Sequence, residues 1–475
     1  MQDPVRLRLH NTESRVLEEV FPSDGKAVRM YTCGPTVYNF AHIGNFRTYV
    51  FEDLLRRSIK FFGMKVHQVM NLTDIDDKTL KGAIEGGIPL DVYTEPYKKA
   101  FFEDLQALGL EPADAYPEAT KYIPAMIKLI QTLIEKGVAY HGQDRSVYFA
   151  IRKFPSYGRL SHLHLDELQV GASQRIADEY DKENAADFVL WKSYDPERDG
   201  EIYWESPFGR GRPGWHIECS AMAIELLGPS IDIHAGGVDN IFPHHENEIA
   251  QSECCTSQRF ARIWAHSEHL LVDHKKMSKS AGNFYTLRDL LNRGYTGRQV
   301  RFALLSTHYR SQLNFTFASL QAAASSLERL DDFIARLEGI QNDKGQPQAE
   351  ILLHDAHQKF SAALADDLNI SPALGTLFDL VRSVNTLCDE NRISKLEAEK
   401  ILQFLKNIDT VLGVLFTREE EEIPIELQEM LVKRNEARAE KNWPLADECR
   451  QLIYEHGYVI EDSPTGSRLK KLAKS

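Results

Sequence analysis

Residues 27–75 contain a strand, a helix and a second strand in direct succession, and this succession constrains the fold more than any other stretch. The apolar run AVRMYTC at 27–33 predicts a strand, and a Gly-Pro turn leads into a helical pattern over about 45–62. Gly63 ends that helix, and KVHQVMNLTDI at 65–75 predicts the next strand. Two strands joined by a helix form a βαβ unit, so the predicted fold class is α/β. Ligands of such sheets bind in the loops at the carboxyl ends of the strands.

The chain is long and apolar enough for several folded domains. Its 475 residues suggest about three or four domains at roughly 100–200 residues each. Hydrophobic residues make up 43% and charged residues 27%, which excludes wholesale disorder. Lys and Arg number 56 against 70 Asp and Glu, a net charge of −14. Because phosphate neutralisation requires cations, this charge argues against a protein that binds polyanions indiscriminately.

The sequence favours a cytoplasmic protein without a membrane anchor. It contains no uninterrupted apolar run of the roughly 18 residues that a membrane span needs. The start, MQDPVRLRLH, lacks the apolar core of a signal peptide. Six cysteines are too few for a disulfide scaffold, so we expect a reducing compartment. Four of them lie outside the motifs described below and are expected to be structural: Cys254, Cys255, Cys388 and Cys449.

Helical and turn-rich segments alternate along the rest of the chain. A helical pattern over about 91–140 precedes a turn-rich stretch at 141–212, which contains strand-like runs such as SVYFAI and has the character of an insertion. Apolar strands return at 213–270. Two mainly helical stretches follow, at 286–340 and 350–415, with the polar linker QNDKGQPQAE between them.

His42-Ile43-Gly44-Asn45 lies between the first strand and its helix and is a candidate phosphate site. A helix N-terminus offers unpaired N–H groups and the positive end of its dipole. Gly44 lets a ligand approach the backbone, and His42 can donate a hydrogen bond to a phosphoryl group. Taken alone, an ordinary capped helix with a surface histidine is the more frequent explanation.

Lys276-Met277-Ser278-Lys279-Ser280 follows the apolar run LLVD and is a second candidate phosphate site. Two lysines around small polar residues can hold a leaving pyrophosphate as point charges. An exposed basic loop is the alternative, but a specific five-residue match arises by chance in about one of 10⁴ such chains. The histidine motif strengthens this signal further.

Four residues form a candidate metal set of two thiolates, an imidazole and a carboxylate. His244 and Glu248 are four residues apart in PHHENEIAQ, so on a helix they share a face. Cys219 in GWHIECSAM and Cys33 at the end of the first strand complete a plausible zinc set. The spacing is neither that of a zinc finger nor the HExxH of zinc proteases. Buried packing is the alternative for either cysteine, and His245 is expected to make a local hydrogen bond.

Five segments together resemble cysteinyl-tRNA synthetase, a family of class I aminoacyl-tRNA synthetases: TCGPTVYNFAHIGN, NLTDIDDK, RPGWHIECSAM, FPHHENEIAQ and KMSKSAGNF. The resemblance runs from about residue 5 to the C-terminus. It implies a Rossmann-type parallel-sheet catalytic domain that activates L-cysteine with ATP to cysteinyl-adenylate and releases pyrophosphate. Transfer of the cysteinyl group to the 3′ end of tRNA(Cys) would follow, and a monomer is expected.

The resemblance also implies an order of domains along the chain. The expected parts are 1–115 (first half of the Rossmann domain), 116–212 (an inserted connective peptide subdomain), 213–270 (its second half), 271–345 (the KMSKS loop and stem-contact helices), 346–422 (an anticodon-side helical bundle) and 423–475 (a small anticodon-reading domain).

Carried over position by position, the resemblance names residues of the ATP and cysteine sites. His42 and Asn45 would close the ATP-phosphate site, although the family's motif often has a second histidine where Asn45 stands. Lys276 and Lys279 would stabilise the transition state in which pyrophosphate leaves, and Lys279 would also bind ATP. The positions around cysteine and the adenylate are Thr73, Trp215, His234 and Asp239. The alternatives for these four are a strand-end turn, a core aromatic, a satisfied histidine and a capped glycine turn.

Cys33, Cys219, His244 and Glu248 match the family's ligands for one zinc ion per subunit. Zinc would select the substrate thiolate, since a thiol of pKa about 8.5 ionises readily on a metal. Such a site can reject analogues by about 10⁴–10⁵-fold without editing. Four protein ligands plus substrate exceed the usual count, so Glu248 is expected to bind weakly or shift. Mg²⁺ would accompany ATP.

The last part of the chain resembles the tRNA-reading half of the family. LADDLNISPAL near residue 366 matches the helical bundle, and the final segment matches the terminal domain. Arg438, Trp443 and Asp462 are candidate anticodon contacts there, because arginine and tryptophan stack on splayed bases and a carboxylate accepts from a base amino group. Alternatively, Trp443 packs in a small core and Asp462 caps a turn.

Three other functions fit part of the pattern. A ligase that joins cysteine to an amino sugar would share the zinc and adenylate site, but it would lack the long helical and terminal portion. A non-catalytic RNA-binding paralogue would show decayed ATP motifs. A structural zinc protein would not need the lysine loop.

The acidic charge is unevenly distributed. Residues 270–330 contain nine Lys or Arg against three Asp or Glu. Residues 426–475 contain nine of each, so the whole net charge of −14 lies within 1–425. An acidic body with basic strips suits a protein that docks one RNA in one orientation.

Overall fold

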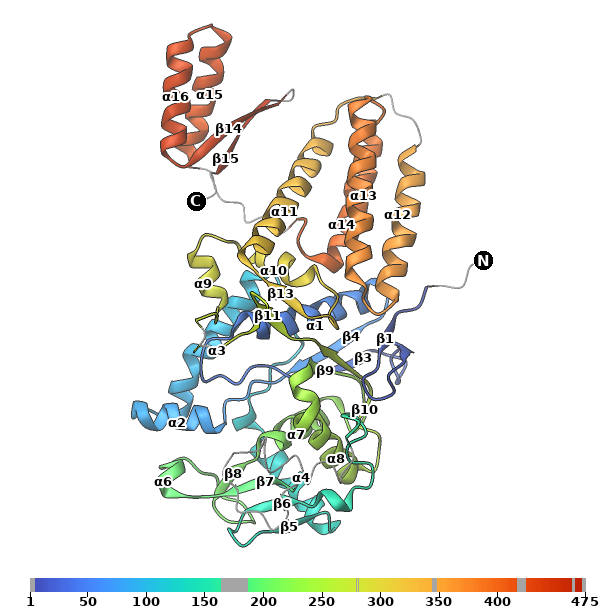
Figure 1. Cartoon of the computed structure of the whole chain (residues 1–475), viewed down its shortest axis with the longest axis vertical. Coiled ribbons are helices and arrows are strands. Elements are labelled where there is room, and N and C mark those ends of the chain that lie inside the picture. Colours follow the sequence, from blue (N-terminus) through green and yellow to red (C-terminus); the bar gives the residue numbers. More distant parts are fainter. Residues whose placement is uncertain are drawn as a thin grey trace.

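The computed structural model describes residues 5–163, 187–278, 280, 282–343, 348–416, 424–463 and 466–471. Figure 1 shows an elongated molecule with a central sheet in its middle, an inserted sheet at the lower end and a helical bundle at the upper end. The C-terminal unit stands beside that bundle. Within the described part of the chain, none of the helices is long and apolar enough to cross a membrane.

The central sheet consists of four parallel strands in the order β10-β9-β3-β4. The crossover from β3 to β4 runs through a long helix, which confirms the predicted βαβ unit. The elements are β3 (Val28–Thr32), α1 (Ile43–Phe61), β4 (Val66–Met70), β9 (Ile231–Gly237) and β10 (Ala261–Ser267).

Strand β4 is shorter than the stretch over 65–75 that the sequence predicts. Beyond Met70 the backbone leaves the sheet and pairs with the segment around 115–118. The N–H of Leu72, for example, donates to the carbonyl of Pro117 at 2.8 Å. This turn away from the sheet carries the following residues toward the end of β3.

Helices cover both faces of the central sheet, and alternate strand residues divide between two cores. Met30 and Ile233 pack with α1 on one face. Tyr31 and Trp264 pack on the other face with three helices. These helices are α4 (Ile123–Glu135), α7 (Trp215–Leu227) and α8 (Glu246–Thr256).

The turn-rich stretch forms a second sheet, which is antiparallel and has the order β5-β6-β7-β8. The predicted strand-like run SVYFAI contains one of its strands. The elements are β5 (Ala139–His141), β6 (Val147–Phe149), β7 (Phe188–Ser193), α6 (Pro196–Asp199) and β8 (Gly211–Pro213). Two further helices, α2 (Asp77–Gly86) and α3 (Leu90–Ala107), follow β4.

Short strands and long helices make up the rest of the chain. A small sheet contains β11 (Leu270–Val272), β12 (Lys275–Lys276) and β13 (Leu313–Phe315). The helices are α9 (Leu287–Asn292), α10 (Gly297–Leu305), α11 (Phe317–Glu338), α12 (Gln348–Ala365), α13 (Ile370–Asp389) and α14 (Lys395–Leu412). The C-terminal unit contains α15 (Ile425–Ala439), α16 (Trp443–Glu455), β14 (Tyr458–Ser463) and β15 (Gly466–Lys471), and an N-terminal hairpin pairs β1 (Arg8–His10) with β2 (Leu17–Glu19).

A buried ion pair joins α1 to the helical bundle. The side chains of Arg301 on α10 and Asp53 on α1 are 0% and 2% exposed, and the guanidinium donates to the carboxylate. Nε of Arg301 also donates to the carbonyl of Leu412, at the end of α14, at 2.8 Å. Burial opposes ionisation of Asp53, but Arg301 and Arg57 hold the pKa of its carboxyl below the usual value. The anionic Asp53 and the negative end of the α14 dipole therefore share these cations.

We expect Arg301→Met to lower the midpoint of thermal unfolding by several degrees, because removing one partner of a buried ion pair costs about 3–5 kcal/mol. Differential scanning calorimetry measures this shift. Arg382→Met is the matched control, because Arg382 pairs with Asp379 at the exposed surface, where such pairs contribute little. Equal midpoints for the two variants would contradict the structural importance of the buried pair.

Candidate active site

A cavity of about 510 Å³ opens at the carboxyl ends of the four parallel strands, where the βαβ topology predicts a ligand. Segments that follow each strand form most of its wall, and α1, α7 and β12 complete it. The lining includes Cys33, Thr36, His42, Gly44, Asn45, Asn71, Thr73, Trp215, Cys219, Asp239, His244, His269, Lys276, Met277 and Gln312.

His42 and Asn45 cap the N-terminus of α1 reciprocally. The N–H of Asn45 donates to Nδ1 of His42, and the N–H of His42 donates to Oδ1 of Asn45, both at 3.1 Å. Burial lowers the pKa of His42, so its ring is neutral near pH 7. Because Nδ1 accepts a hydrogen bond, the ring proton lies on Nε2 and remains available to a ligand. A Cβ at Gly44 would lie 3.0 Å from this ring, so glycine keeps the corner open.

The lysine motif lies against the same helix end. Lys276 lines the cavity from β12, and the amide of Asn283 holds the loop through Lys276 and Ser278. Farther along, the N–H of Ile43 donates to the carbonyl of Tyr285 at 2.9 Å, which ties the segment after the loop to the start of α1. The structure thus brings His42, Asn45 and Lys276 to one cavity, whereas Lys279 lies outside the described residues.

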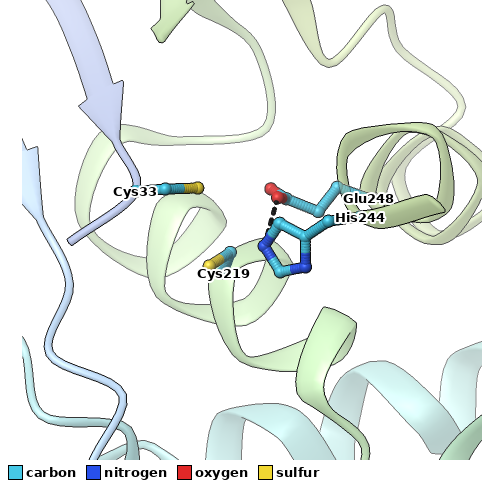
Figure 2. Close-up of side chains that lie close together, drawn as sticks. All are labelled: Cys33, Cys219, His244 and Glu248. Carbon is cyan, nitrogen blue, oxygen red and sulfur yellow. Dashed lines mark ion pairs between the residues drawn. The ribbon is translucent and has the colours of Figure 1, made fainter. Parts of the chain in front are cut away.

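The four predicted metal ligands converge from the end of β3, from α7, from the helical turn Ile241–His245 and from the first turn of α8 (Figure 2). Their donor atoms all lie within 4.8 Å of one another, and each residue is at most 8% exposed. Nε2 of His244 lies 3.0 Å from Oε1 of Glu248. Among the described residues, that buried oxygen forms this ion pair but accepts no hydrogen bond of good geometry.

The charges of this cluster suit a divalent cation. Burial opposes ionisation of Glu248, but His234 and His244 lower the pKa of its carboxyl to about 2. Burial also opposes protonation of His244, but Glu248 and Cys219 raise its pKa to about 10. A hydrogen bond from Cys33 lowers the pKa of Cys219 to about 6. A carboxylate and a thiolate thus face one imidazolium, whose proton a bound metal would replace. The sulfur, nitrogen and oxygen atoms are then donors that zinc accepts.

A second set of donors overlaps the first. Cys33 and Glu248 also lie within 4.8 Å of donor atoms of His234 and His245. Nε2 of His234 is 2.9 Å from Oε2 of Glu248. His245 lies 3.2 Å from the sulfur of Cys33 and 2.8 Å from His266. The hydrogen-bond partners of His245 are therefore distant in sequence instead of local, although Nε2 also lies 3.9 Å from Oε1 of Glu248. His234 holds Glu248 and is not among the residues that line the cavity.

The other three predicted pocket residues line the cavity. Trp215 is exposed, and its ring stacks on His244 at 4.2 Å, so the alternative of a core aromatic is wrong. Oδ2 of Asp239 lies 3.3 Å from Nδ1 of His269. The hydroxyl of Thr73 accepts a hydrogen bond from Asn71 at 3.1 Å.

Sequence reasoning missed His269, Asn71 and Gln312, which line the same cavity. Asn71 and His269 follow β4 and β10 closely, so the rule that ligands bind at strand ends could have found them. Gln312 comes from the loop before β13 and carries no such signal.

The predicted anticodon residues lie in the C-terminal unit. Trp443 begins α16 and is 56% exposed, and the core of this unit is formed by Leu427, Ile453 and Tyr458. The alternative that Trp443 packs in a small core is therefore wrong. Arg438 is exposed near the end of α15. Asp462 lies in β14, with its side chain outside the described part of the structure.

Comparison with known proteins agrees with this geometry. Residues 19–325 match the family described as tRNA synthetases class I (C) catalytic domain, and residues 359–417 match the DALR domain. The cysteine–tRNA ligase of Protochlamydia amoebophila (strain UWE25) is 62% identical over 98% of both chains. That of Chlamydia caviae is 56% identical over 98% of both. Mycobacterium tuberculosis methionyl-tRNA synthetase in complex with methionyl-adenylate shares the fold, with a TM-score of 0.58 and 14% identity over 82% of this chain and 90% of that chain.

The parallel sheet, the cavity at its edge and the helical bundle are those of a class I aminoacyl-tRNA synthetase. The predicted α/β fold class is therefore confirmed. The chain belongs to the cysteine–tRNA ligase family and is an aminoacyl-tRNA ligase, as the resemblance implied.

Gly34 lies where the ends of β3 and β4 approach most closely. A Cβ there would lie 1.8 Å from the carbonyl oxygen of Asn71. We expect Gly34→Ala to lower the midpoint of thermal unfolding by several degrees, since overpacking costs about 1–3 kcal/mol. Circular dichroism follows the transition. Gly375→Ala in α13 is the control, because its Cβ meets nothing within 4 Å and alanine favours a helix. A Gly34 variant as stable as this control would disprove the close contact.

Proposed function

We propose that this ligase activates L-cysteine with ATP and transfers the cysteinyl group to the 3′ end of tRNA(Cys). The observation that carries the proposal is that residues of both ATP motifs and a buried cluster of cysteine, histidine and glutamate share one cavity. The 62% identity to a cysteine–tRNA ligase over nearly the whole chain supports the choice of amino acid.

ATP would lie between the N-terminus of α1 and the lysine loop. His42 would donate from Nε2 to the phosphates, while Asn45 keeps His42 in place through the cap. Lys276 and Lys279 would stabilise the charge on the leaving pyrophosphate. The carboxylate of cysteine attacks the α-phosphorus, so positioning and charge stabilisation suffice without an acid–base residue at the carboxyl group. Mg²⁺ would accompany ATP as part of the substrate.

Cys33, Cys219, His244 and Glu248 would hold one Zn²⁺ per subunit, which supplies a Lewis acid for the substrate thiolate when bound. The burial of all four donors supports this assignment, as does Oε1 of Glu248, which accepts no well-directed hydrogen bond from the described residues. His234 offers that carboxylate a second partner at 2.9 Å, which fits the expectation that Glu248 binds weakly or shifts.

The walls next to the cluster would hold the rest of the amino acid. Trp215 and Thr73 border the place of the cysteine side chain. The carboxylate of Asp239 complements the ammonium group of the substrate. His234 would contribute through its hydrogen bond to Glu248.

The bundle and the C-terminal unit would dock tRNA(Cys). Arg438, Trp443 and Asp462 are the proposed anticodon contacts, and the exposed ring of Trp443 supports stacking on a base. The domain roles given above, a monomeric state and a cytoplasmic location form part of the same proposal.

Cysteine-dependent ATP–pyrophosphate exchange tests the activity, and zinc analysis of the same protein tests the metal. We expect about one zinc per chain, and loss of both zinc and exchange in Cys219→Ala or after treatment with a chelator. Cys254→Ala, a cysteine outside the cluster, should retain both. Exchange by zinc-free protein, or equal exchange with serine, would contradict zinc selection. Exchange without charging of tRNA would indicate a different acceptor, such as an amino sugar.

We expect Trp443→Ala and Asp462→Ala to reduce charging of tRNA(Cys) while ATP–pyrophosphate exchange stays unchanged, because the exchange reaction does not need the anticodon. Loss of one base stack corresponds to about 1–3 kcal/mol, or about five- to 150-fold in the rate of charging. Val432→Ala, an exposed residue of α15 in the same unit, is the control. Equal loss of both activities would refute an anticodon role.

A further inference from the structure

Four aromatic side chains form a patch beside the cavity, which we call the aromatic rim: Tyr38, Phe40, Tyr93 and Tyr97. Phe40 is 41% exposed, and its ring meets that of Tyr97 edge-on at 5.5 Å. Tyr97 contacts Tyr93 at 5.6 Å, and the hydroxyl of Tyr93 donates to the carbonyl of Tyr38 at 3.1 Å. The other three rings are partly buried, so the exposed ring of Phe40 rests on a layer of packed aromatic side chains.

The rim adjoins the cavity along the chain. Tyr38 and Phe40 lie between Thr36 and His42, which both line the cavity. Consecutive Cα atoms are about 3.8 Å apart, so the Cα atoms of Phe40 and His42 are separated by at most about 7.6 Å. The backbone that carries Phe40 is therefore close to the proposed ATP-phosphate corner, although the ring of Phe40 itself does not line the cavity.

Two cationic side chains lie over the rim. Nζ of Lys78 is 4.8 Å from the ring centre of Tyr38, and the guanidinium of Arg288 is 5.3 Å from that of Phe40. Arg288 also pairs with Glu103 at 2.6 Å and approaches Asp104, so it contributes a flat surface more than a net charge. Flat rings with a neighbouring cation suit nucleobases and their phosphates, whereas an apolar peptide would gain nothing from Lys78.

Single exposed apolar residues are common and need no explanation. The rim differs because the rings of Phe40, Tyr97 and Tyr93 contact in series, and Tyr93 is tied to the backbone of Tyr38. The segment that carries Tyr38 and Phe40 also borders the cavity in which cysteinyl-adenylate would form. The nucleic acid that must reach this place is the unpaired 3′ end of the tRNA.

We propose that the aromatic rim stacks the unpaired bases at the 3′ end of the tRNA as the terminal ribose enters the cavity. The inference rests on the proposed function, because that reaction requires a single-stranded RNA end here. Stacking tolerates any base, so the rim positions the end without selecting among tRNAs. Phe40 is then a positioning residue for the transfer step and has no part in adenylate formation.

Single-turnover transfer from preformed cysteinyl-adenylate to tRNA tests the rim. We expect Phe40→Ala to slow transfer or raise the KM for tRNA about tenfold, as for the loss of one stacked base. Phe40→Trp, which keeps a ring, should restore the rate. Phe21→Ala is the matched control, because Phe21 is 44% exposed beneath the guanidinium of Arg262 at 3.9 Å but lies in another part of the chain. Exchange should be equal in all variants.

A tRNA with 2-aminopurine in its unpaired 3′ end reports stacking directly, since stacking quenches its fluorescence. We expect the wild-type protein to quench this signal and Phe40→Ala to lose the quenching. The proposal would be overturned if Phe40→Ala quenched the fluorescence and transferred the cysteinyl group as well as the wild-type protein does. It would also be overturned if Phe40→Ala lost as much affinity for a tRNA that lacks its unpaired 3′ end as for the intact tRNA. A change in the sedimentation of Phe40→Ala would likewise overturn it, because the rim would then be a contact between two copies of the chain. Absence of exchange in the wild-type protein would instead reject the proposed function itself.

Discussion

The cavity of this ligase depends on four parallel strands that end at one edge of a sheet. Parallel strands carry their carboxyl ends side by side, so residues that follow β3, β4, β9 and β10 meet although they are far apart in the chain. The N-terminus of α1 adds the positive end of a helix dipole at the same edge. Helix α7, which carries Trp215 and Cys219, begins directly after β8, the last strand of the inserted sheet.

Local patterns predicted the βαβ unit at this edge but not helix α7, which lies within the stretch at 213–270 where strands were expected. The βαβ unit follows from a strand, a turn and an amphipathic helix within fifty residues, and all three are present. The cap of α1 uses His42 and Asn45 of the motif itself. Cys33, Cys219, His244 and Glu248 could be proposed together because a helical spacing and a family resemblance agreed, and their donor atoms converge.

Tertiary contacts decided what the sequence could not predict. The end of β4 depends on a pairing with residues 115–118, which no local pattern encodes. His234 does not line the cavity, because its ring points from β9 toward α8 and forms a hydrogen bond with Glu248. Asn71 is held in the cavity wall by hydrogen bonds with the backbone of Gly34 and the hydroxyl of Thr73, and these contacts are not visible in the sequence. The exposure of Trp443 also had to come from the structure, because the local sequence at the start of a helix does not show whether a tryptophan there is buried or exposed.

The contacts of Arg301 bear on how far the two halves of the molecule are separate units. This one guanidinium joins Asp53 of the nucleotide-side helix to the last carbonyl of α14, beyond the expected boundary at 345. A fragment cut there would keep Arg301 and Asp53 but lose the Leu412 carbonyl that also accepts from this guanidinium. A helical bundle taken from a relative would therefore have to provide the acceptor for Arg301 as well as a compatible linker. Separate segments in the sequence are therefore not separate units of folding here, because the helical bundle shares one hydrophobic core with α1 and the sheet.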